Sequence, residues 1–147
     1  SAYVTDIINN TTAMDLNTDA SLKVALFNDT ITPSQTVASA STAFNTGVWL
    51  TAAEVFEAGQ WATGGVALTS PTSTFSTNVY TFDAADTASG SAADLASVFG
   101  CLVYDDTIAT PVVDQGMCYN YFGGSNSVVN GTFTVVWNAS GIFNLTL

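Results

Sequence analysis

The chain has 147 residues and a net charge of −11, because 12 acidic side chains stand against one lysine and no histidine. Nucleic acids are therefore excluded as partners, since phosphate binding requires clustered Lys or Arg. The mean hydropathy is high, at +0.34, yet no run reaches the roughly 18 apolar residues of a membrane span. Binding to anionic membranes also requires clustered Lys or Arg, so we expect no membrane partner. This length suits one domain.

The chain is also poor in charge of either sign. Only 9% of its residues are charged, whereas about a quarter is usual for a soluble domain. This low density favours a surface that is covered by further copies of the chain, as in a homo-oligomer. Acidic residues on adjacent copies would repel one another, so we expect association to need salt or a cationic partner.

Residues 1–20 are predicted to form an N-terminal arm or a short helix. Their first apolar side chains follow the i, i+3 and i+4 spacing of a helix, whereas the Asn and Thr residues that come next disfavour its continuation. A single β-domain is then expected to comprise residues 21–147.

Short apolar or alternating segments, separated by Gly, Ser, Asn and Asp clusters, predict an all-β fold, an antiparallel β-sandwich or a jelly-roll-like domain. The expected strands are residues 22–27, 66–69, 72–77, 79–83, 98–104 and 115–122. The expected connections are a long surface loop at 32–47, a helical turn at 51–57 that leaves Trp61 on the flank, loops at 84–94 and 105–114, and a turn at 123–126.

The last segment is predicted to be a β-hairpin that closes the core. Because side chains alternate across a strand, each of its two runs places three large groups on one face, namely Phe133, Val135 and Trp137, and then Phe143, Leu145 and Leu147. We expect Val135 to lie opposite Phe143, and Phe133 opposite Leu145. Gly141 would absorb the irregular turn as a bulge or in a left-handed conformation.

The two cysteines lie on two strongly apolar segments. If these segments pair with Tyr104 opposite Gln115, then Cys101 lies directly opposite Cys118. A cross-strand disulfide can then form, and two packed free thiols are the alternative.

The missing histidine excludes a Ser-His-Asp triad, a Cys-His pair and histidine-based zinc sites. Lys23 is expected to be an edge or rim residue rather than a catalytic one. The remaining option is a carboxylate pair such as those of glycosidases, for which the sequence offers Glu54 with Glu57, Asp83 with Asp86, and Asp105 with Asp106. Acids in such loops usually solvate turns or cap helices. A cation near Asp105, Asp106 and Asp114 is geometrically possible, but the spacing matches neither an EF-hand nor a nonapeptide repeat. We therefore expect no enzyme, no cofactor and no specific metal site.

Several segments together resemble a family of small virion structural proteins of tailed bacteriophages. They are residues 22–27 (LKVALF), 64–68 (GGVAL), 79–86 (VYTFDAAD), 102–106 (LVYDD) and, most specifically, 130–147 (NGTFTVVWNASGIFNLTL). The chain departs from that family in having almost no Lys or Arg, in its two cysteines and in its long Ser/Thr/Ala loop at 32–47.

The resemblance implies a non-enzymatic capsid decoration, or cement, protein. Such a protein binds the major capsid protein on the outside of the virion, after assembly in the host cytoplasm, and it stabilises the head lattice. It implies a homo-oligomer, expected here to be a trimer, with the N-terminal arm and the loop at 32–47 as candidate shell contacts.

Two other functions remain open from the residues. A head- or tail-fibre module, or another tail-associated module, could bind host glycans through exposed Trp49 or Trp61, because flat aromatic rings stack on sugars. A glycoside-cleaving enzyme would need two acids that converge in a cleft.

Overall fold

The computed structural model describes Leu16 and residues 21–146, and every strand pairing within them is antiparallel. The N-terminal arm expected at residues 1–20 lies outside this part of the chain, apart from Leu16. The strands are β1 (Leu22–Phe27), β2 (Glu54–Val55), β3 (Val66–Ala67), β4 (Thr69–Ser76), β5 (Val79–Ala85), β6 (Thr87–Ala88), β7 (Ala93–Asp105), β8 (Gly116–Gly131), β9 (Thr134–Val135) and β10 (Phe143–Thr146), with one 3-10 turn at Ser39–Ser41.

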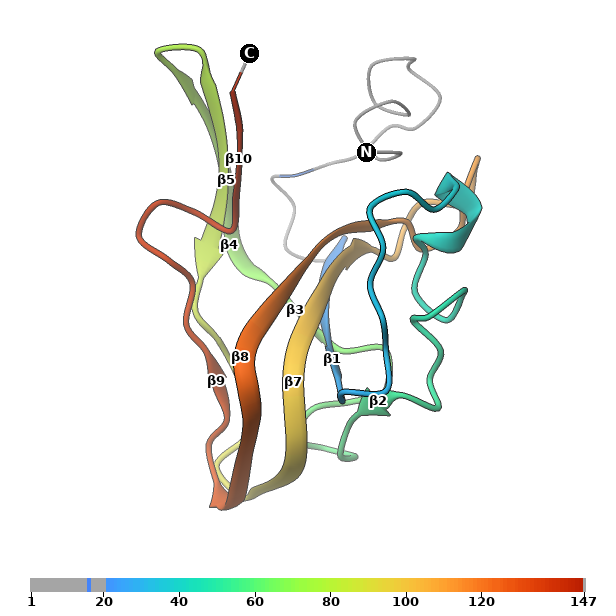
Figure 1. Cartoon of the computed structure of the whole chain (residues 1–147). Helices are drawn as coiled ribbons and strands as arrows, with labels where there is room; N and C mark the ends of the chain where they lie inside the picture. Colours follow the sequence, from blue (N-terminus) through green and yellow to red (C-terminus); the bar gives the residue numbers. More distant parts are fainter. Residues whose placement is uncertain (1–15, 17–20, 147) are drawn as a thin grey trace.

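The main sheet has the order β2-β1-β7-β8, and β3 also pairs with β1. Its two long strands, β7 and β8, bend along their length in Figure 1, so that the sheet is curled into a half-barrel. The β7–β8 ladder changes register at several points, and extra residues at such points bend and twist a strand pair. The predicted antiparallel all-β architecture is confirmed.

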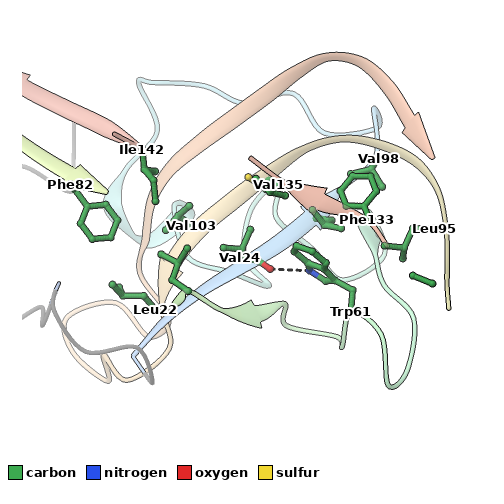
Figure 2. Packing of buried hydrophobic residues seen from close by; sticks show 14 residues of the cluster. Leu22, Val24, Trp61, Phe82, Leu95, Val98, Val103, Phe133, Val135 and Ile142 are labelled. Atoms are coloured by element: carbon green, nitrogen blue, oxygen red, sulfur yellow. Dashed lines mark hydrogen bonds between the residues drawn. The ribbon is translucent and has the colours of Figure 1, made fainter. Parts of the chain in front are cut away.

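Each face of the main sheet packs its own apolar cluster, because successive side chains point to opposite faces. One cluster is built on Leu22, Val24 and Leu26 of β1 and on Val98, Cys101 and Val103 of β7. Figure 2 shows how Phe82 of β5, Val135 of β9, and Phe133 and Ile142, which directly precede β9 and β10, close this cluster. The cluster on the opposite face contains Ala25, Phe27, Trp49, Leu102 and Tyr104.

Trp61 belongs to the first cluster rather than to the flank of the domain. Its side chain is fully buried, and its Nε1–H donates a 3.0 Å hydrogen bond to the carbonyl of Val24 (Figure 2). The helical turn expected at 51–57 forms only at its start, where the amides of Ala53 and Glu54 bond to the carbonyls of Leu50 and Thr51. Residues 54 and 55 pair with the end of β1 instead, because that strand edge offers backbone partners that a lone turn cannot match.

The strands β4, β5 and β10 form a separate sheet in the order β10-β5-β4. In Figure 1 they run side by side away from the main sheet, and the end of β10 lies near the β4–β5 turn. That turn contains Thr77 and Asn78, both with positive φ (50° and 63°), as two-residue hairpins require. We call this sheet the three-stranded extension.

The C-terminal hairpin predicted from Phe133, Val135, Trp137, Phe143, Leu145 and Leu147 does not form. β9 pairs with β6, and β10 pairs with β5 in the extension, so the two runs belong to different sheets. Alternation specifies which face of a strand is buried but not which strand is its neighbour. The first two side chains of the set are buried and the next three are partly exposed, while Leu147 lies outside the described residues.

Of the two turns predicted at glycines, the one at Gly141 is present and the one at 123–126 is not. Gly141 has a φ of +99°, and an added Cβ would lie 2.8 Å from the carbonyl oxygen of Phe82, so the left-handed conformation is confirmed. The turn expected at 123–126 is absent. β8 passes from Tyr121 opposite Gly100 to Asn126 opposite Val98, and its surplus residues are absorbed as a bulge in a continuous strand.

Candidate functional site

A groove lies between the loop that follows β1 and the first residues of β8. Its volume is about 780 Å³, and no charged residue of the described chain lines it. The loop at 32–47, expected as a long surface connection, forms one wall, and the groove is lined mainly by apolar groups, including Pro33, Val37, Val48, Trp49, Met117 and Tyr119.

The floor of the groove is an aromatic cluster. Trp49 packs edge-on against Phe27, with ring centroids 5.5 Å apart, and lies 5.2 Å from the Tyr119 ring. Burial raises the pKa of Tyr119 to about 12 and that of the neighbouring Cys118 thiol also to about 12, so both groups stay protonated at neutral pH. The groove therefore offers a neutral, partly apolar contact surface without an activated nucleophile.

The two tryptophans that could stack on glycans are core residues. Trp61 is fully buried and Trp49 is 7% exposed, and the Trp49 ring is occupied by aromatic neighbours. A sugar-stacking platform needs an exposed ring face. Neither residue provides one in this structure.

The acidic pairs singled out in the sequence are used mainly as hydrogen-bond acceptors for backbone amides. Such local bonds fix turns and strand ends and leave the carboxylates separately engaged. The contacts are Glu57 with the Asp94 amide (2.6 Å), Asp83 with the Ala84 amide (2.9 Å), Asp86 with the Trp137 amide (3.0 Å) and Asp105 with the Thr107 amide (2.9 Å).

Glu54 is the most perturbed acid of the described chain. It is buried, and its Oε1 accepts a 2.7 Å bond from the Gly64 amide, whereas its Oε2 has no hydrogen-bond partner among the described residues. Burial raises the pKa of Glu54 from 4.5 to about 7, against the opposing effect of the amides of Gly64 and Gly65. Tyr104 closes the same corner by donating a 2.6 Å bond to the Gly64 carbonyl. Glu57, its expected partner, instead accepts a bond from the Asp94 amide, so the two carboxylates are separately engaged.

The single lysine forms an ion pair. Lys23 lies 2.5 Å from Asp106, and it sits on β1, an inner strand flanked by β7 and β3, rather than at a sheet edge. Burial, followed by the charge of Asp106, raises the pKa of Asp114, while Lys23 lowers it. No group of three or more Cys, Asp or Glu side chains in the described ranges is arranged to hold a metal ion.

The cysteines are free thiols in a register that differs from the expected one. Tyr104 pairs with Gly116 rather than with Gln115, and the ladder shifts by one further residue between Val103 and Tyr104, so Cys101 lies opposite Asn120 and Cys118 lies opposite Val103. The shift makes the cysteines diagonal neighbours, for which Cα atoms are about 7–8 Å apart. A disulfide needs a separation of roughly 4.4–6.8 Å, so the alternative of two packed thiols describes the structure.

The extension provides a second candidate surface, which strand register defines. Phe75, Tyr80 and Leu145 are cross-strand partners, and Phe82 and Phe143 form the adjacent row on the same face. On the opposite face Thr74, Thr81 and Asn144 form a polar row, in which the Thr81 hydroxyl donates to the Asn144 side chain at 2.7 Å. The sequence showed the alternation of each strand, but the rows appear only once the partners are known.

Comparison with protein-family models, with curated proteins and with solved structures found no match. Across Leu16 and residues 21–146, no helix has both the length and the apolar character needed to cross a bilayer. The resemblance to bacteriophage virion proteins therefore stays a prediction from the quoted motifs.

Proposed function

We propose that the chain is a non-enzymatic structural protein of a tailed bacteriophage, a decoration or cement protein that binds the major capsid protein on the outside of the head. The assignment to the virion rests on the sequence resemblance, above all that of residues 130–147. The expected homo-oligomer, taken as a trimer, belongs to the same proposal.

The observation that carries the proposal is the uncharged groove beneath the loop at 32–47. Its lining combines Ser and Thr hydroxyls with apolar side chains and has no charged group, a composition that suits contact with a protein segment. Trp49 and Tyr119 of its lining already pack against each other, and side chains held by such packing lose little entropy when a partner binds.

The mechanism is mass action. A subunit that binds the assembled lattice, and binds free capsid protein less well, stabilises the lattice in proportion to the logarithm of its free concentration. An interface of roughly 1,200–2,000 Å² is usual for such specific contacts.

Electron microscopy of purified particles tests the location. We expect density for this chain on the outer surface of the head, repeated with the lattice. Its presence only in tails, or its absence from purified particles, would contradict the proposal.

A binding assay with undecorated heads tests the groove. Val48→Asp places a charge in the neutral groove, and we expect at least a roughly tenfold loss of affinity. Val113→Asp is the matched control, because Val113 is an exposed valine outside the groove and should bind as the wild type does. Equal binding of both variants would show that the shell contact lies elsewhere.

A further inference from the structure

We propose that the apolar face of the three-stranded extension, made by Phe75, Tyr80, Phe82, Phe143 and Leu145, is a self-association surface that packs against the same face of further copies of this chain. The inference rests on the homo-oligomer of the proposed function and deepens it by naming the contact. It does not depend on the groove.

The extension is amphipathic in the way that a covered sheet requires. Its apolar row of Phe75, Tyr80 and Leu145 lies on one face, and the row of Thr74, Thr81 and Asn144 lies on the other. A sheet with only one apolar face normally has that face covered.

Coverage by the described residues decreases along the extension. At its base Phe82 is fully buried in the main core, and Phe143 lies 5.4 Å from it. In the next row Tyr80 and Leu145 are half-buried, and Phe75 is 61% exposed. The domain therefore covers Phe82 fully, covers Phe143, Tyr80 and Leu145 in part, and leaves Phe75 open. An exposed aromatic group in such a patch marks an interface.

The lack of charge on these rows suits a second copy of the chain better than it suits a cationic partner. Asp83 is the only charged residue in β4, β5 and β10, and it is the cross-strand partner of Thr72, not of the aromatic rows. A cationic partner would find no carboxylate among these rows. A second copy also has a net charge of −11, and because these rows carry no charge, its approach here brings no like charges together. The cores of protein interfaces are depleted of charge in the same way.

Sedimentation velocity and light scattering of the purified full chain test this surface. We expect a concentration-dependent oligomer, and Phe75→Asp should raise its dissociation constant at least ~100-fold, because buried aromatic anchors dominate interfaces. Thr74→Asp is the matched control. It adds the same charge to the adjacent exposed position of β4 on the polar face, and it should leave the oligomer intact.

A wild-type chain that stays monomeric at about 100 µM in roughly 0.5 M NaCl, where its acidic groups are screened, would overturn the proposal. Equal dissociation of the two variants would also overturn it, because the effect would then come from charge alone.

Hydrogen exchange of the wild type keeps the test decisive if Phe75→Asp fails to fold. Residues 69–85 and 143–146 should gain protection as protein concentration rises, and unchanged protection there would contradict the contact. Because these measurements use purified protein, they can fail while the chain is still found on phage heads, or succeed while it is not.

Discussion

Glu54 shows how one side chain makes stability depend on pH. Its carboxyl group is buried beside the Gly64 amide, and its pKa rises to about 7. The folded chain therefore holds this proton more tightly than the unfolded chain, whose value is near 4.5. The favourable contribution is complete below about pH 4.5 and is lost as pH rises through 7.

Glu54→Gln should stabilise the protein at pH 8 by roughly 2 kcal/mol and change little at pH 4.5, because the amide stays neutral while still accepting the Gly64 hydrogen bond. Thermal unfolding at both pH values measures the difference. Glu57→Gln removes a charge from a nearby side chain that binds the Asp94 amide, and it should show no gain confined to high pH. Equal effects of Glu54→Gln at both pH values would refute the explanation.

At the scale of the strand pair, the β7–β8 register keeps the two cysteines unbonded, and their burial keeps both thiols protonated. Burial raises the pKa of Cys101 well above its ordinary value and that of Cys118 to about 12. At pH 8 and a pKa of 12, roughly one thiol in 10⁴ is ionised, so reaction with iodoacetamide is slow.

We expect neither cysteine to be alkylated in the native protein within minutes. Both should be alkylated in urea without a reductant, because both are free. Mass spectrometry counts the modified thiols, and a reduced sample serves as the control. A denatured, unreduced sample that takes up no label would reveal a disulfide and contradict the register.

The strands themselves were largely predictable from local sequence. Leu22, Val24 and Leu26 alternate and are buried as expected, and the expected strands at 66–69, 72–77 and 79–83 correspond to β3, β4 and β5. What sequence could not provide was pairing. The alternation of Phe133 and Val135 is the same whether their partner is β10 or β6, so the hairpin was an inference from proximity along the chain.

The functional surfaces were harder to foresee for the same reason. Trp61 is surrounded by Gly and polar residues, which favours an exposed position, yet it is held in the core by a bond to the Val24 carbonyl, 37 residues away. The loop at 32–47 was recognisable as a loop, but the groove needs Met117 and Tyr119 from a distant strand. Long-range contacts of this kind leave no periodicity in the sequence.

For the whole molecule, charge is the dominant constraint. With a net charge of −11 and a single lysine, repulsion among the acids should destabilise the folded state at low ionic strength. We expect the melting temperature to rise with NaCl between 10 mM and 0.5 M, by about 2–4 °C for each kcal/mol gained.

Sucrose provides the control, because it stabilises without screening charge, and Na₂SO₄ at matched ionic strength shows any ion-specific part. A melting temperature that is the same at low and high NaCl would show that the acids are already compensated within the fold.

Lys23 also allows the opening of the main sheet to be followed by proteolysis. Trypsin cleaves after Lys or Arg, and Lys23 is the only such residue in the sequence. The bond after it lies in β1, which is hydrogen-bonded to β7 on one edge and to β3 on the other. Digestion of the native protein must wait until this inner strand separates from its neighbours, and it should then yield two fragments, residues 1–23 and 24–147. The rate at which the longer fragment appears would therefore report how often β1 separates from the main sheet.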